Sequence, residues 1–92
     1  MELNEKLARW AGIKTIEALR LSGIFFPDSL DLCFQWLVPK IDMLWNIEFQ
    51  LLDKGYVAVL EYGSDREIVG KAETPALALC KAIEQYIEEV EK

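Results

Sequence analysis

The stretch 56–62 constrains the fold of this chain more than any other segment, because it is apolar at nearly every position. Tyr56, Ala58 and Leu60 would lie on one face of a β-strand, and Val57 and Val59 on the other. A strand in a sheet with one solvated face shows apolar and polar residues in alternation instead. The stretch therefore predicts a central strand in a sheet that is covered on both faces.

Two flanking segments predict the other strands of an antiparallel meander. Residues 45–52 alternate apolar and polar side chains, which is typical of a half-buried strand. The connection 53–55 is a short hairpin loop in which Gly55 supplies a positive φ. After a turn at 63–66, residues 67–72 predict a third and weaker strand.

Helical periodicity marks both ends of the chain. Residues 2–11 place their apolar side chains on one helical face, and Gly12 follows where a C-terminal glycine belongs. Thr74 and Pro75 are typical of a helix start. The helix after them has one apolar stripe, which comprises Leu79, Ala82, Ile83, Tyr86, Ile87 and Val90.

The segment between the first helix and the sheet is less regular. Residues 14–26 are compatible with a further helical turn or with an irregular, extended stretch, with a break at 22–23. A second helix is predicted to begin at 27–29 and to end before Pro39. Its predicted buried face comprises Leu30, Cys33, Phe34 and Leu37.

These patterns predict one α+β domain over residues 1–92, with the element order ααβββα. A chain of 92 residues has the size of a single domain. Because the central strand is apolar on both faces, we expect the three-stranded antiparallel meander to lie between helices, as an α-β-α sandwich. The last helix then covers one face of the sheet, and an N-terminal helix covers the other.

The charge of the chain disfavours general binding to nucleic acids. Lys and Arg number 10 and Asp and Glu number 16, which gives a net charge of −6, and no two basic residues are adjacent. Non-specific affinity for DNA or RNA comes from the neutralisation of phosphates, which an acidic chain does poorly. A local patch that binds one small anionic ligand remains compatible with this charge.

The residue types present exclude much familiar catalytic chemistry. The chain has no histidine, so Ser-His-Asp triads and histidine-containing zinc sites are excluded. The five glycines form no phosphate-binding motif. Asp28 and Asp31 lie near a helix start, where carboxylates are favourable without any catalytic role. We therefore expect a protein that is not an enzyme and that has no catalytic residue, no metal site and no cofactor.

Cysteine usage and hydropathy indicate the cellular setting. Cys33 and Cys80 lie in apolar helical segments, which favours buried free thiols over a disulfide or a reactive role. The amino end, residues 1–5, is acidic and unlike a signal peptide. No apolar run approaches the ~18 residues of a membrane-spanning helix. These features predict a soluble cytoplasmic protein that does not bind membranes.

Three segments are similar to a known family: 3–12 (LNEKLARWAG), 26–40 (FPDSLDLCFQWLVPK) and 72–83 (AETPALALCKAI). Together they resemble the phage ABA sandwich domain family, small phage and prophage proteins, mostly of Gram-positive hosts, with helices on both faces of an antiparallel sheet. The similarity reaches nearly the whole chain, although the middle strands match only in pattern and the segment between Gly12 and Phe26 is shorter and poor in Trp. It implies an origin and an architecture but no chemistry.

The aromatic residues are the main candidates for binding. Ten aromatic side chains are more than a domain of this size fully buries, so either their rims are partly exposed or some of them form an interface. Trp36 lies off the apolar helical stripe and Trp45 stands at the very start of the strand predicted at 45–52, so we expect both at an interface. Arg9 and Trp10 form a further candidate pair, because an aromatic ring and an Arg can stack on a nucleobase-like ligand.

These observations predict a small phage or prophage accessory protein that acts by binding. A counter-defence role would follow from sequestering a nucleotide-like signal or from masking a host protein. The alternative is a structural or replication-associated phage component without a ligand. With a mean hydropathy of +0.10, the chain has more apolar surface than one small core absorbs, so we also expect a homo-oligomer.

Overall fold

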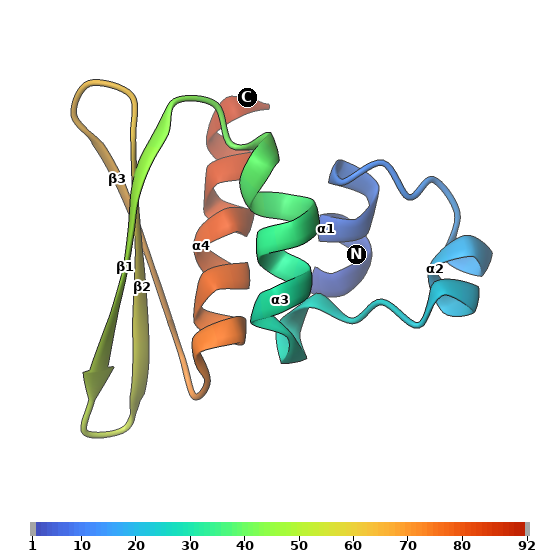
Figure 1. Cartoon of the computed structure of the whole chain (residues 1–92), viewed down its shortest axis with the longest axis horizontal. Coiled ribbons are helices and arrows are strands. Elements are labelled where there is room, and N and C mark those ends of the chain that lie inside the picture. Colours follow the sequence, from blue (N-terminus) through green and yellow to red (C-terminus); the bar gives the residue numbers. More distant parts are fainter. Residues whose placement is uncertain (1, 92) are drawn as a thin grey trace.

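A three-stranded sheet and the helix that follows it form the centre of the computed structural model, which describes residues 2–91 (Figure 1). The sheet is antiparallel, with the strand order β1-β2-β3. Each strand begins one residue before its predicted start, and each ends where predicted. The bounds are β1 Leu44–Leu52, β2 Gly55–Tyr62 and β3 Arg66–Ala72, followed by helix α4 at Pro75–Val90.

Local geometry explains the hairpin and the first strand. Leu52 pairs with Gly55 across a turn of two residues, so Gly55 begins β2 rather than lying in the loop. Its predicted positive φ is confirmed, at 148°. The register of β1 shifts between Leu44 and Asn46, which makes Trp45 a bulge residue.

Helix α4 begins where the sequence predicts and packs closely on β3. The Thr74 hydroxyl accepts a hydrogen bond from the Leu77 N–H at 3.2 Å, and Pro75 takes the first helical position. Gly70 allows the close approach, because a Cβ there would lie 2.3 Å from the Ala78 carbonyl oxygen. The predicted apolar stripe is buried except for Val90, which lies at the end of the helix and is exposed.

The remaining helices are short, and their geometry varies. Within 14–26 the chain forms a short helix, α2, which ends at Gly23 with φ 72°, so the break predicted at 22–23 is confirmed. The helix predicted to begin at 27–29 and to end before Pro39 instead changes between three helical geometries and continues to Lys40. The bounds are α1 Leu3–Trp10, α2 Ile16–Ser22, η1 Phe26–Asp28, α3 Leu30–Leu32, the π-helix η2 Cys33–Leu37 and η3 Val38–Lys40.

The prediction that Phe34 is buried is wrong. Cys33 and Leu37, one turn apart on η2, take the fully buried positions, and they point toward the core. Phe34 follows Cys33 directly and is therefore rotated to the flank of the helix, where it is 44% exposed.

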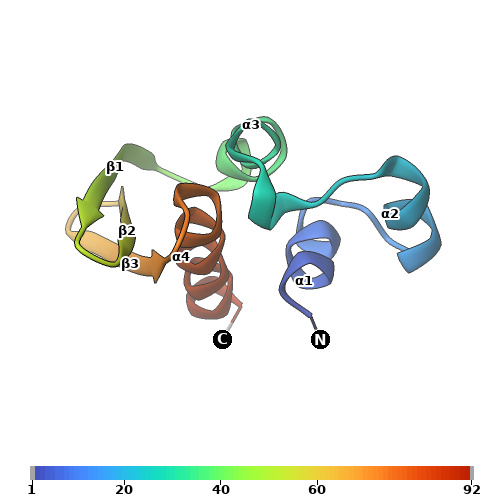
Figure 2. The same cartoon turned by 90° about the horizontal axis from the view of Figure 1, so that it is seen from below.

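The helices all lie on one side of the sheet. α4 packs on β2 and β3, while α1, η1 and α3 pack on α4, and α2 lies farthest from the sheet (Figures 1 and 2). The α+β class, the antiparallel meander and the order of helices and strands are therefore as predicted. The N-terminal helix is not where we expected it, because it packs on the side of α4 that faces away from the sheet.

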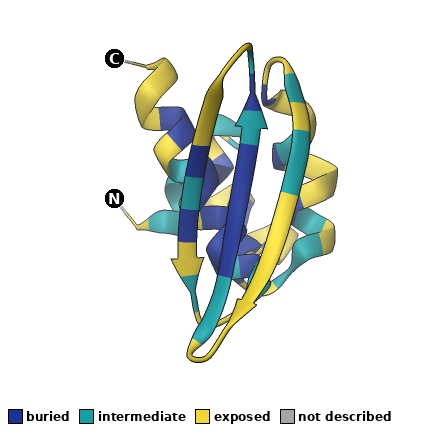
Figure 3. Cartoon of the chain, turned by 90° about the vertical axis from the view of Figure 1, so that its left-hand side faces the viewer, coloured by how far each residue is buried: buried dark blue, intermediate teal, exposed yellow. Residues whose placement is uncertain are grey.

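The sheet face opposite α4, which we call the far face, explains this difference. Figure 3 looks onto this face, and no helix of residues 2–91 lies in front of it. Val57 lies between Gln50 and Lys71 on the neighbouring strands, and Val59 lies between Glu48 and Val69. Between these flanking side chains the two valines are only 6% and 9% exposed. Two apolar faces on a central strand thus do not require two helical layers.

The core lies between the sheet and the helices. Its largest fully buried side chains are Phe26, Leu7, Leu37, Leu60, Leu79 and Ile83. Cys33 and Cys80 are buried in the same core as free thiols, as predicted, with their sulfur atoms 3.4 Å apart. None of the helices within residues 2–91 has the length and apolar character needed to span a membrane.

Candidate binding surfaces

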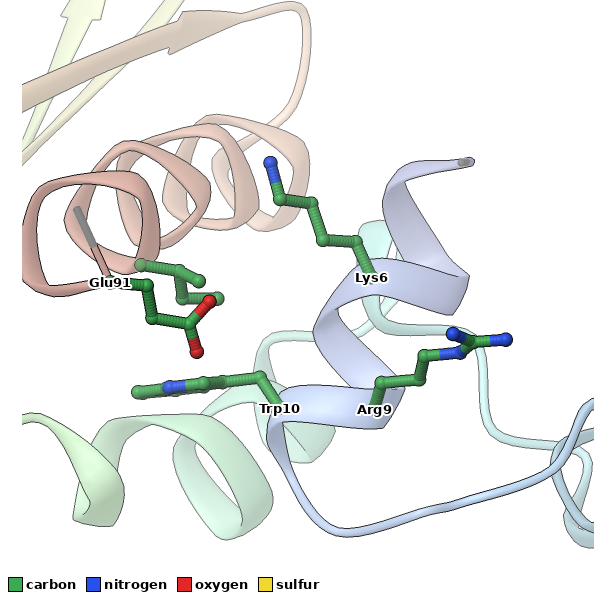
Figure 4. Close-up of a pocket in the computed structure, with 5 residues that line it drawn as sticks. Lys6, Arg9, Trp10 and Glu91 are labelled. Carbon is green, nitrogen blue, oxygen red and sulfur yellow. The ribbon is translucent and has the colours of Figure 1, made fainter.

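A cleft of about 420 Å³ contains two of the predicted binding residues (Figure 4). Lys6, Arg9 and Trp10 line it from α1, and Ile87 and Glu91 line it from the end of α4. The packing of α1 against α4 therefore places Arg9 and Trp10 beside an acidic residue that is distant in the sequence.

The positive charges of this cleft are already partnered or directed elsewhere. The Lys6 ammonium lies 2.8 Å from a Glu88 carboxylate oxygen and 3.5 Å from one of Glu84. Its hydrogen bond with Glu88 raises the pKa of Lys6, so the side chain stays protonated and paired. The Arg9 guanidinium points away from Trp10 and Glu91, whereas the Glu91 carboxylate points toward Trp10 (Figure 4). The cleft thus offers little uncompensated positive charge to an anion.

Trp10 has a packing role, in keeping with its predicted place on the apolar face of the first helix. Its ring meets Tyr86 edge-on, with 6.0 Å between the ring centroids, and the Lys40 ammonium lies 5.7 Å from the Trp10 centroid. Tyr86 in turn packs edge-on against Tyr62 and accepts a hydrogen bond from the Asp42 N–H. Trp10 therefore connects α1 to α4 and to η3, and its loss would disturb the fold as well as the cleft.

The other two predicted binding residues lie elsewhere. Trp36 is on η2 and 37% exposed, and Trp45 is on β1 and 61% exposed. The Trp45 indole N–H donates a hydrogen bond to the Gly63 carbonyl at 3.1 Å, which orients the ring at the start of β1. The four predicted residues are thus distributed over α1, η2 and β1, and only Arg9 and Trp10 share a cleft.

A surface that sequence reasoning missed lies along β1. Ile47, Phe49 and Leu51 pair with Leu60, Ala58 and Tyr56 of β2, so their side chains lie on the same face of the sheet as the core. α4 packs over β2 and β3, so this face of β1 is covered only where Ile47 packs against the core and is open toward the end of the strand (Figure 2). Phe49 and Leu51 are consequently exposed. We call Ile47, Phe49 and Leu51 the β1 apolar edge.

The two edges of the sheet differ in how well they are protected from pairing with another chain. β3 carries Arg66, Glu67 and Lys71, and the Gln85 side chain donates a hydrogen bond to the Val69 carbonyl at 2.8 Å. β1 has nine residues, of which Glu48 alone is charged. Charged and covered edges prevent pairing with another chain, whereas long apolar edges favour it. The alternation at 45–52 was the available signal, but it indicated half-burial rather than an open edge.

Known proteins add no further information about these surfaces. No family model, curated protein or solved structure matches the chain. Among residues 2–91, no three Cys, Asp or Glu side chains gather in a way that would hold a metal ion.

Proposed function

We propose that this chain is a phage or prophage accessory protein that acts by binding a protein, and that it counters host defence by masking that protein. The observation that carries the proposal is the exposure of four large apolar side chains, Trp36, Trp45, Phe49 and Leu51. Aromatic anchors of this kind dominate the energy of protein interfaces. The phage origin rests on the resemblance to the phage ABA sandwich domain family.

The electrostatics of the α1–α4 cleft favour a protein partner over a nucleotide-like signal. A phosphate-bearing ligand needs several free donors or cations. Lys6 is paired with Glu84 and Glu88, and Glu91 adds a negative charge beside Trp10. An anion entering the cleft would have to displace these carboxylates, which opposes binding.

Self-association in the host cytoplasm is part of the proposal. An apolar surface that is exposed in one chain is commonly covered by symmetric pairing with a second copy. Trp36 and Trp45 are the expected anchors, and truncation of an anchor costs about 2 kcal/mol or more of association free energy. The alternative function, a structural or replication-associated phage component, would use the same surface without a host partner.

Comparative co-purification from lysate of the bacterial host tests the proposal. We expect one host protein to be retained by the wild type and by Leu21→Ala, and to be lost from Trp45→Ala and Trp36→Ala. Leu21 is the matched control, because it is 83% exposed but lies on α2, far from the sheet. Native mass spectrometry of the same samples distinguishes the alternatives. A retained nucleotide would support sequestration, and the absence of any partner would support a structural role.

A further inference from the structure

The hairpin geometry fixes which backbone groups of β1 face outward. A two-residue turn is closed by a hydrogen-bonded pair, here Leu52 and Gly55. Hydrogen-bonded and non-hydrogen-bonded pairs alternate along an antiparallel ladder, so Gln50 and Glu48 also bond to β2. The N–H and C=O groups of the β1 apolar edge, at residues 47, 49 and 51, therefore point away from β2. Within residues 2–91 no other strand pairs with them.

Unpaired backbone groups and exposed apolar side chains thus coincide at Phe49 and Leu51, while Ile47 is half-buried. Phe49 is 36% exposed and Leu51 is 74% exposed, on the helix side of the sheet. Such an edge is a template for a further strand. We propose that β1 pairs with β1 of a second copy of this chain, antiparallel and about a two-fold axis, to form one continuous six-stranded sheet. This inference rests on the self-association that the proposed function includes, and it places the contact at Ile47, Phe49 and Leu51 of β1 instead of at the expected anchors Trp36 and Trp45.

The sequence of β1 is self-complementary in one register. With the axis at Phe49, the two copies of Phe49 face each other, Ile47 faces Leu51 of the second copy, and Glu48 faces Gln50. The outward-pointing backbone groups of Ile47, Phe49 and Leu51 then all lie opposite outward-pointing groups of the second copy. An axis at Glu48 would place two carboxylates directly opposite each other, which is destabilising. An axis at Leu51 would pair Phe49 with the turn residue Asp53.

The symmetry also brings the apolar side chains together. A two-fold axis perpendicular to the sheet keeps both helical layers on the same side. Ile47, Phe49 and Leu51 of both copies then form one apolar strip between the two α4 helices. The polar side chains of Glu48 and Gln50 stay on the far face, in water. A second copy of the chain therefore satisfies both the backbone groups and the apolar side chains of this edge.

Charge substitutions at Phe49 test the pairing, because this residue faces itself in the proposed register. By sedimentation at micromolar concentration we expect a dimeric wild type, and a dissociation constant at least tenfold higher for Phe49→Lys alone and for Phe49→Glu alone. An equimolar mixture of the two variants should recover a heterodimer, since opposite charges then face each other. Leu21→Lys, which adds the same charge on α2, should remain as dimeric as the wild type.

Each other result overturns a defined part of the inference. A monomeric wild type would contradict self-association itself. A dimer that Phe49→Lys does not weaken would contradict the β1 interface while leaving self-association intact. Monomeric single variants that fail to recover on mixing would contradict the register. Circular dichroism checks that each variant folds, and Leu51→Lys provides a second edge variant at a more exposed position, with the same expected loss of dimer.

Discussion

Asn4 is a buried polar residue that holds the start of the chain to the segment before η1. Its side-chain oxygen accepts a hydrogen bond from the Phe26 N–H at 2.8 Å, and its amide nitrogen donates to the Ile24 carbonyl at 3.2 Å. Asn4→Ala leaves these buried backbone groups without partners, so we expect a loss of about 2–3 kcal/mol in the free energy of unfolding. Urea titration followed by circular dichroism measures this loss.

Asn46 provides the comparison for this prediction. Its amide donates to the Glu61 carboxylate at 2.8 Å, but the pair lies on the far face, where water can replace either partner. Asn46→Ala should therefore cost less than about 1 kcal/mol. If Asn4→Ala and Asn46→Ala lower the free energy of unfolding equally, burial of the backbone partners of Asn4 is not the cause of its effect.

The Cys33 and Cys80 thiols should be unreactive in the folded protein. The hydrogen bond with Cys33, together with burial, raises the pKa of the Cys80 thiol above its ordinary value of 9.0. Because the thiolate is the reactive form and both thiols are fully buried, an aromatic disulfide reagent should modify neither cysteine at pH 8 until denaturant is added. Modification of either thiol in native buffer, at a rate that matches the unfolded chain, would contradict this account.

The same pKa shift gives the thiol a defined effect on stability. The pKa of Cys80 is higher in the folded chain than in the unfolded chain. The contribution of its protonated thiol to the free energy of unfolding is therefore fully present below about pH 9 and is lost as the pH rises above that value. Cys80→Ala should reduce this pH dependence. It should also lower the free energy of unfolding by about 1–2 kcal/mol at neutral pH, through the small cavity it leaves.

At the scale of elements, the contact between β3 and α4 depends on Gly70. A Cβ at this position would lie 2.3 Å from the Ala78 carbonyl oxygen and 2.5 Å from the Ala82 nitrogen, both of which are helix backbone. Gly70→Ala must therefore push α4 away from the sheet, and we expect a loss of about 3 kcal/mol or more, measured by thermal and urea unfolding.

Val69, the neighbouring residue on the other face of β3, is the control. It is partly buried on the far face and has no helix against it, so Val69→Ala should cost about 1 kcal/mol. A Gly70→Ala variant as stable as Val69→Ala would mean that the backbone of α4 at Ala78 and Ala82 does not pack closely against Gly70.

The sequence predicts the elements well where local chemistry decides them. Alternation and turn residues locate the three strands, and the Thr74 cap with Pro75 locates α4, because these signals act within a few residues. Non-local packing decides the rest. The packing of Cys33 and Leu37 into the core leaves Phe34 on the flank of η2, and the bulge at Trp45 follows from pairing with β2, which no local pattern reveals.

At the scale of the whole molecule, the single-sided arrangement of helices determines which surfaces remain open. The apolar character of β2 predicts that both faces of the sheet are covered, but Val57 and Val59 lie between side chains of the neighbouring strands instead. One long helix cannot span three strands, so α4 leaves β1 open. Composition thus predicts excess apolar surface, but only the arrangement of layers places it at β1. Of the predicted site residues, Arg9 and Trp10 lie together in one cleft, while Trp36 and Trp45 do not join them.

The exchange rates of the β1 backbone amides, measured by NMR at several protein concentrations, test the proposed pairing most directly. In dilute protein, the amides of Glu48 and Gln50 should exchange slowly, because they bond to β2, and those of Ile47, Phe49 and Leu51 should exchange fast. At concentrations where sedimentation shows the dimer, all five amides should exchange slowly. Fast exchange of Ile47, Phe49 and Leu51 in the dimer would contradict the pairing of β1 with a second copy.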